Sequence, residues 1–302
     1  MQELNQQIRD KMRDRAVELL SSGVSSVVAW TRDEDLPAGS RPVVVQSTGA
    51  AQSICYDEHC GLNLSKFAKK QLGRTESRVA VFLKPCDTYS MNQLISESQA
   101  DRNRIHVVAV GCPGMRGLEG KFLQKCLTCK GPEHKVYDEL LGENISREEL
   151  ESAAEGRFGE VARLEAMSDE ERYEFWRGHL SKCVRCNACR NICPACVCRS
   201  CVFDNPKSGI SGKANPSDYE EKLYHIVRAF HVAGRCSDCG ECSRACPNDV
   251  PLHLLNRKYI KNINELYGDF QAGESSETNI SPLNSYSAGD IHPKDVGGSA
   301  NV

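Results

Sequence analysis

Two runs of four cysteines constrain this chain more than any other feature of its sequence. Both runs have the spacing C-x2-C-x2-C-x3-C, and a proline directly follows the fourth cysteine. The first run is Cys183, Cys186, Cys189 and Cys193, and the second is Cys236, Cys239, Cys242 and Cys246. A cubane of iron and sulfur needs four thiolates, and two-residue gaps let one short loop supply three of them. Each run is therefore predicted to supply ligands to a [4Fe–4S] cluster.

The fourth cysteine of each run is predicted to serve the other cluster. Such exchange is usual in two-cluster proteins with this spacing, and the proline stops the chain from returning into its own site. We expect the fourth cysteine to enter a helix after the loop. The predicted ligand sets are Cys183, Cys186, Cys189 and Cys246 for one cluster, and Cys236, Cys239, Cys242 and Cys193 for the other. Zinc is the alternative metal, but it favours paired C-x2-C elements without a terminal Cys-Pro.

Cysteine is over-represented, with 17 among 302 residues. An odd number, the length of the chain and an N-terminus without the apolar core of a secretory signal disfavour a disulfide framework. We therefore expect a cytoplasmic protein whose clustered cysteines bind metal. The longest apolar stretches have only strand length, so no membrane-spanning segment is predicted. The formal net charge is −3 without a large basic field, which disfavours nucleic acid as a partner.

The first part of the chain reads as a small parallel-sheet α/β domain over residues 1–140. Residues 3–20 form a candidate amphipathic helix. Further along, Val-rich segments that indicate buried strands alternate with helical candidates. The strands are expected at 25–30, 41–46, 77–83 and 104–110, and helices at 64–72 and 87–98. In such sheets, ligands bind beyond the carboxyl ends of the strands.

A helical linker is expected over residues 141–182, which are polar and charged. Two capping boxes indicate helix starts, one from Ser146 with Glu149 and one from Ser168 with Glu171. The alternative is a linker that is solvated throughout.

An α-helical dicluster ferredoxin domain is predicted over residues 183–270. One good helix is expected at 217–234, with an apolar stripe on one face. The stripe consists of Leu223, Ile226, Val227 and Phe230. The tail, 271–302, is rich in Gly, Ser, Asn and Pro, so it is predicted to be flexible alone or an extended arm that lies on a partner.

A third metal site is one interpretation of the cysteines in the first domain. Three expected strands end in cysteines on what should be one rim of the sheet, and a C-x2-C pair follows soon after. The first choice of ligands is Cys86, Cys112, Cys126 and Cys129, with Cys55 or Cys60 as substitutes. Alternatively, Cys86 precedes Asp87, a candidate helix N-cap, and could be a lone reactive thiol. Any of these cysteines could also be a small core residue.

Three more cysteines, Cys196, Cys198 and Cys201, follow the first run. Each could replace Cys193 as a ligand, join a further site with Cys55 and Cys60, or be inert. The sequence does not decide between these roles.

The two halves resemble different families. The long gap between the runs, which contains a helix, and the stretch GRCSDCGECSRACPNDVPLHLL (234–255) resemble the α-helical ferredoxin modules of heterodisulfide reductase and succinate dehydrogenase iron–sulfur subunits. The stretches KPCDTYSMNQL (84–94) and VVAVGCPGM (107–115) resemble the β-subunit family of deazaflavin-dependent hydrogenases and formate dehydrogenases. In this chain the ferredoxin module follows the α/β domain, whereas that family commonly carries it first, and no G-x-G-x-x-G follows a strand.

The resemblance implies an iron–sulfur electron-transfer subunit of a larger complex in an anaerobe, with other redox subunits as partners. No HExxH, P-loop or nucleophile elbow suggests bond chemistry within this chain. The alternative that the resemblance implies is a flavin-containing oxidoreductase that uses a deazaflavin or a nicotinamide. Lys84, Cys86 and Asp87 would then line the FAD pocket. A third alternative is a scaffold that zinc stabilises.

Overall fold

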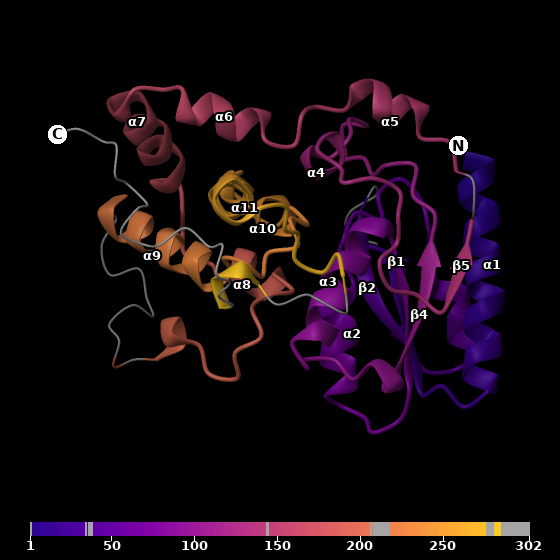
Figure 1. Ribbon diagram of the computed structural model, residues 1–302. Helices are drawn as coiled ribbons and strands as arrows, with labels where there is room; N and C mark the ends of the chain where they lie inside the picture. Colours follow the sequence, from indigo (N-terminus) through magenta and orange to yellow (C-terminus); the bar gives the residue numbers. More distant parts are fainter. Residues whose placement is uncertain are drawn as a thin grey trace.

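The computed structural model describes residues 2–33, 35, 39–142, 145–205, 207, 218–275 and 281–284. The first half contains α1 (Gln2–Ser21), β1 (Ser26–Arg32), β2 (Ser40–Val45), α2 (Ser65–Leu72), β3 (Val79–Leu83), α3 (Pro85–Ser96), β4 (Ile105–Val110), α4 (Gln124–Leu127) and β5 (Glu139–Leu141). The second half contains α5 (Glu148–Ala153), α6 (Gly159–Glu165), α7 (Asp169–Leu180), α8 (Ala188–Ile192), α9 (Asp218–His231), α10 (Glu241–Arg244) and α11 (Leu252–Tyr267). Figure 1 shows the sheet on one side of the molecule and the bundle of α8 to α11 on the other.

The sheet has the order β2-β1-β3-β4-β5. The four strands that the sequence predicts are all present, and β1, β3, β4 and β5 run parallel. The predicted parallel-sheet α/β domain is confirmed, with one antiparallel edge strand, since β2 pairs antiparallel with β1. The connection between these two strands has hairpin length, whereas a parallel neighbour needs a crossover of about a dozen residues. The short edge strand β5 was missed because it lacks a Val-rich run.

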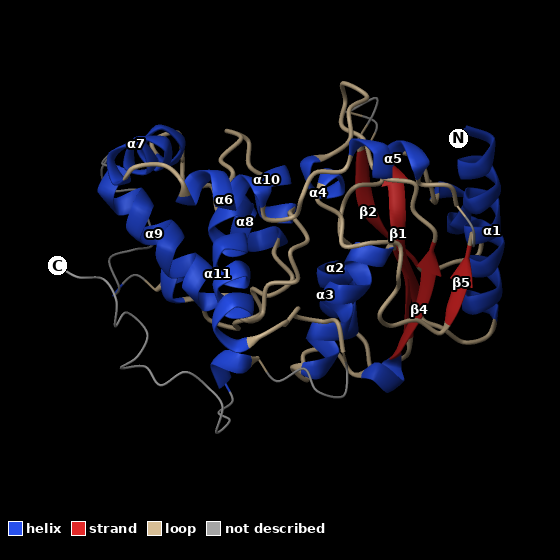
Figure 2. Cartoon of the chain, turned by 45° about the horizontal axis from the view of Figure 1, so that its top comes forward, coloured by secondary structure: helices blue, strands red, loops and turns tan. Residues whose placement is uncertain are grey.

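Helices cover both faces of the sheet. Figure 2 shows α1 on one side and α2 with α3 on the other. β3, at the centre, is buried along its whole length. On β1, the buried Trp30 packs against Tyr56 and lies 4.1 Å from the ammonium of Lys84. The result is a three-layer α/β domain with its core around the central strands.

The helix after β3 begins earlier than the sequence suggests. α3 starts at Pro85, and its N-cap is Lys84. The prediction of Asp87 as the N-cap is therefore wrong, because proline favours the first helical position and sets the start of the helix. Asp87 lies in the first turn, where its carboxylate is favourable near the helix N-terminus.

The expected linker region is helical and packed. In Figure 1, α5, α6 and α7 run across one edge of the molecule from the sheet to the bundle. Leu150, Val161, Leu164 and Leu180 are buried there, so a fully solvated linker is excluded. The capping box of Ser168 and Glu171 is confirmed. The Ser146 box is wrong, because α5 begins one residue later than that box requires, with Arg147 as its N-cap.

In the bundle, helix α9 turns the face opposite to its apolar stripe inward. Helix α9 is confirmed, but Leu223, Ile226 and Phe230 of its apolar stripe are 50%, 41% and 59% exposed. The opposite face of the helix is buried and carries Tyr224, His225, Arg228 and Ala229. Hydrophobic periodicity therefore found the helix but not its buried face. The cysteine runs lie against this buried face, as described below.

Buried ion pairs join the two halves. Lys125 donates a 2.6 Å hydrogen bond to Glu241, and both side chains are almost fully buried. The buried Arg257 of α11 pairs with Asp238 at 3.1 Å and also donates to the hydroxyl of Thr128 in the first half at 3.1 Å. These contacts fix the sheet domain against the loop of the second cysteine run. The expected tail lies largely outside the described residues.

Replacing Lys125 with methionine is expected to lower the free energy of unfolding by about 3 kcal/mol. Within the described part of the chain, the change leaves the buried carboxylate of Glu241 with Arg244 as its one remaining partner, and breaking a buried pair on one side is costly. Denaturant unfolding under anaerobic conditions measures the effect. The matched control is Lys121→Met, which breaks an exposed pair with Glu119 and should cost no more than about 1 kcal/mol. If both variants lowered the free energy of unfolding equally, the buried Lys125–Glu241 pair would not be a stabilising contact.

None of the described helices is both long enough and apolar enough to cross a lipid bilayer.

Candidate metal centres

The two cysteine runs share one backbone conformation. In each, the residues directly before and after the second cysteine have positive φ. These are Arg185 at 50° and Asn187 at 63° in the first run, and Asp238 at 53° and Gly240 at 69° in the second. Left-handed residues are uncommon outside glycine, so their recurrence at the same positions marks an imposed loop. The loop curls the chain so that the first three thiols of a run converge.

A short helix follows each loop. The third cysteine of each run lies inside it, Cys189 in α8 and Cys242 in α10. The fourth cysteines, Cys193 and Cys246, follow the end of the helix, so the prediction that they would enter it is wrong. The helix instead carries the fourth cysteine away from its own loop. Because α8 and α10 pack against each other, each fourth cysteine arrives beside the other run.

Four thiols line the first cavity. Cys183, Cys186 and Cys189 of the first run meet Cys246 of the second there. The cavity is closed by Tyr224, His225 and Leu252. This is the first of the two sets that the exchange rule predicts, although which cysteines bind metal stays a prediction. Two backbone amides point at its sulfurs: Arg185 donates to Cys183 at 3.3 Å and Val250 to Cys246 at 3.5 Å.

The second set gathers around Cys193. Its thiol packs with Cys236 in one buried cluster. Burial raises the pKa of Cys242 to about 12, against the opposing effect of Arg228, and Cys193 adds to the rise. Burial, then Glu241 and Cys193, raise the pKa of Cys239 to about 12. These thiols are therefore neutral without metal, and ligation would release their protons.

Arg228 lies between the two sets. Its side chain is 1% exposed, and none of its three guanidinium nitrogens has a hydrogen-bond partner within the part of the chain that the structure describes. Burial acts to lower the pKa of this guanidinium, but Cys242, Cys189 and Cys193 outweigh it and raise the pKa. A buried, unpaired cation is costly unless an anion lies next to it. Anionic clusters held by these cysteines fit that requirement.

A third cavity lies beyond the carboxyl ends of β3 and β4. Its walls include all four first-choice cysteines, which are Cys86, Cys112, Cys126 and Cys129. The structure thus brings together residues that span more than forty positions of the sequence. Cys239 of the second run also lines this cavity, so the third site and the second ligand set adjoin each other.

Cations and amides surround the third cavity. Lys125, Lys130 and Arg147 line it. Arg147 donates to the thiol of Cys129 at 3.1 Å, and the amide of Met115 donates to Cys126 at 3.3 Å. Burial raises the pKa of Cys112 to about 12. Four thiols with nearby positive charge fit a thiolate-held cluster, which carries negative charge.

The residues predicted to line a flavin pocket are mostly enclosed. Lys84 and Asp87 have fully buried side chains that form a 2.7 Å ion pair. The same ammonium donates to the carbonyl of Leu62 at 2.9 Å. These contacts enclose the side chains of Lys84 and Asp87, so neither is exposed to a flavin. Of the three residues, Cys86 is the one that lines the third cavity. A flavin held by these three residues stays a prediction.

The remaining cysteines fall into two places. Cys196, Cys198 and Cys201 line a separate large cavity between α2 and the bundle. A hydrogen bond with the thiol of Cys193 lowers the pKa of Cys196, which places it next to a predicted ligand. Cys55 and Cys60 lie together in the sheet domain, away from the other three. The interpretation that all five share one site is therefore not supported.

Comparison with known proteins agrees with this geometry. The family described as "4Fe-4S dicluster domain" matches residues 179–250, which contain both runs, and the chain therefore carries two [4Fe–4S] clusters. This part of the chain is therefore similar to iron–sulfur domains that hold two clusters.

Its relatives include two subunits of redox enzymes. The F420-dependent formate dehydrogenase subunit beta of Methanocaldococcus jannaschii is 22% identical, over 79% of this chain and 85% of the relative. A second such subunit, from Methanococcus maripaludis, is 43% identical over 11% of this chain and 10% of its own length. The lactate utilization protein B of Bacillus cytotoxicus is 26% identical over 67% of this chain and 42% of the relative. The resemblance of the first domain to the formate dehydrogenase β-subunit family is thus confirmed, while the likeness to heterodisulfide reductase stays a prediction.

Proposed function

We propose that this chain is an electron-transfer subunit of a larger oxidoreductase complex and relays electrons through three [4Fe–4S] clusters in a row. The observation that carries the proposal is the order of the sites. Arg228 lies between the first and second ligand sets, and Cys239 belongs to the second set while lining the third cavity. Each cluster, when bound, accepts and releases one electron. The chain's part is to hold the clusters close together and exclude water from them.

The site surroundings are suited to redox tuning rather than bond chemistry. Amide and guanidinium donors at 3.1 to 3.3 Å from the sulfurs of Cys183, Cys126 and Cys129 stabilise negative charge there. Such donors make a cluster easier to reduce. The partners are other redox subunits, as the names of two relatives suggest, and we place the complex in the cytoplasm of an anaerobe.

Replacing Cys112 with serine is expected to remove about four iron atoms per chain and leave about eight, because the third cavity then keeps three of its four thiols. The measurement is iron and acid-labile sulfide in protein purified without oxygen. The control is Cys198→Ser, which changes an exposed cysteine outside the ligand sets and should leave iron unchanged. If Cys112→Ser keeps its full iron content, the third cluster is not held by this cysteine.

A flavin-containing oxidoreductase is the second candidate function, and one observation favours it. The cavity that contains Cys196 has a volume of about 1350 Å³ and a cationic lining. Its basic residues are Lys66, Lys69, Lys70, Arg74, Arg104, Arg190, Arg199, Arg228 and Arg235. Phosphate groups of a dinucleotide would suit such walls, and Cys196 places the cavity beside the second ligand set.

Flavin analysis separates the two candidates. FAD or another flavin that is released on denaturation in about one copy per chain would establish the second function. Protein with full cluster content that binds no flavin, even after incubation with FAD, would support the electron-transfer function instead.

A further inference from the structure

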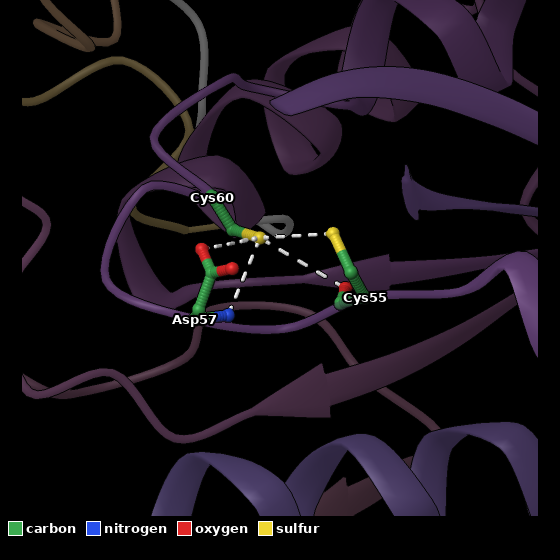
Figure 3. A group of neighbouring side chains, drawn as sticks. All are labelled: Cys55, Asp57 and Cys60. Atoms are coloured by element: carbon green, nitrogen blue, oxygen red, sulfur yellow. Dashed lines mark hydrogen bonds between the residues drawn. The ribbon is translucent and has the colours of Figure 1, made fainter. Parts of the chain in front are cut away.

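A second kind of metal site lies in the sheet domain, apart from the three ligand sets above. Cys55, Asp57 and Cys60 lie on one loop between β2 and α2, with the side chains turned toward one another (Figure 3). The two sulfur atoms are 3.7 Å apart. The Cys60 sulfur is 3.6 Å from a carboxylate oxygen of Asp57. One donor atom from each residue lies within 4.8 Å of the others.

The Cys55–Cys60 and Cys60–Asp57 separations match the edges of a tetrahedron around one zinc ion. Zn–S bonds of about 2.3 Å and Zn–O bonds of about 2.1 Å give tetrahedral edges of about 3.8 Å between two sulfurs and about 3.6 Å between sulfur and oxygen. Two thiolates are too few to hold a cubane, which needs four. This donor set favours binding of a single metal ion of borderline softness, such as zinc.

The loop holds the donors in place without help from a metal. The amide of Asp57 donates to the Cys60 sulfur at 3.4 Å, and the amide of His59 donates to the Asp57 carboxylate at 2.9 Å. Cys55 is tied to β1, since its amide donates to the carbonyl of Trp30 at 2.8 Å. Both sulfurs belong to buried residues, 5% and 0% exposed, so water competes little for the site.

Charge is balanced around a divalent ion. Two thiolates and one carboxylate carry three negative charges, which a divalent cation and one guanidinium neutralise. Arg32 supplies the guanidinium and lies 3.1 Å from the second carboxylate oxygen of Asp57. Outer partners of this kind orient a ligand and strengthen metal binding.

We propose that Cys55, Asp57 and Cys60 bind one zinc ion, with water in the fourth position. On binding, two thiol protons leave to solvent and two Zn–S bonds form, with no change of oxidation state. The ion ties the loop to the sheet. Tyr56 on this loop donates a 2.6 Å hydrogen bond to the carbonyl of Gly111, next to Cys112 of the third cavity. The zinc site therefore stiffens one wall of the neighbouring cluster site.

The test uses the full chain, purified without oxygen, with its clusters filled and zinc added and then dialysed. Elemental analysis should find about one zinc per chain beside the cluster iron. X-ray absorption at the zinc edge, which iron does not obscure, should find two sulfur neighbours at about 2.3 Å and oxygen or nitrogen neighbours at about 2.1 Å. Four sulfur neighbours would mean zinc in a vacated cluster site and would overturn the proposal.

Matched variants locate the ion. Cys60→Ser should abolish stoichiometric zinc, and Asp57→Asn should weaken zinc binding at least about tenfold, while iron stays constant. The control is Glu58→Gln, whose carboxylate lies on the same loop outside the donor set. If Cys60→Ser fails to fold, the zinc affinity of Asp57→Asn still tests whether the ion binds at this loop. Zinc binding that is unchanged in Asp57→Asn, no zinc in protein with full clusters, or a disulfide between Cys55 and Cys60 in the purified chain would each overturn the proposal.

Discussion

Replacing Cys246 with serine is expected to remove the same cluster as Cys186→Ser, although Cys246 belongs to the other cysteine run. The structure places its thiol in the cavity that Cys183, Cys186 and Cys189 line. Iron should fall by about four atoms per chain. The electron paramagnetic resonance spectrum of the reduced protein should then match that of Cys186→Ser and differ from that of Cys239→Ser.

The reciprocal variant completes this test. Cys193→Ser should match Cys239→Ser, since the Cys193 thiol lies with Cys236 and interacts with Cys239. Serine in place of Cys196 serves as the control, because that thiol neighbours Cys193 outside the predicted set. A spectrum of Cys246→Ser that matches Cys239→Ser would refute the exchange of ligands between the runs.

Replacing Arg228 with methionine is expected to lower the reduction potentials of the two dicluster centres by on the order of 100 mV. The buried guanidinium lies among thiols of both ligand sets without another partner in the described chain. A positive charge at such a position stabilises the reduced, more negative cluster, and at an effective dielectric of about 20 the effect is on the order of 3 kcal/mol. Anaerobic redox titration followed by electron paramagnetic resonance gives the potentials.

Arg228→Lys separates charge from packing. Lysine keeps the positive charge, so its potentials should stay near those of the parent chain, whereas methionine keeps the volume and loses the charge. Similar downward shifts in both variants would indicate a packing effect. Unchanged potentials in the methionine variant would mean that Arg228 does not act on the clusters.

The strands and the cysteine runs could be predicted because their signals are local. Val-rich segments such as 77–83 mark buried strands of a parallel sheet, and the recurring cysteine spacing marks a cluster loop. The four cysteines of the third cavity were also within reach, since the carboxyl ends of parallel strands share one edge. The strand β2 was predicted, but its antiparallel direction was not, because the Val-rich pattern of a strand carries no information on its direction.

The burial of Arg228 could not be predicted, because the hydrophobic pattern of α9 indicates the opposite face as the buried one. The apolar stripe with Leu223 and Phe230 is a standard sign of a buried face, yet it is exposed, and the face with Arg228 is buried. Burial of an arginine requires nearby negative charge, and here the groups that would hold anionic clusters are cysteines far away in sequence. Lys125 and Arg147 were also missed, since each meets the third cavity only after its segment has folded against the carboxyl ends of the strands.

The three-cluster relay is tested most directly by the iron and acid-labile sulfide content of the chain purified without oxygen. The relay predicts about twelve iron and about twelve sulfide atoms per chain, with no loss after gel filtration. About eight of each, with Cys86, Cys112, Cys126 and Cys129 still open to alkylation, would contradict a third cluster and leave a two-cluster carrier.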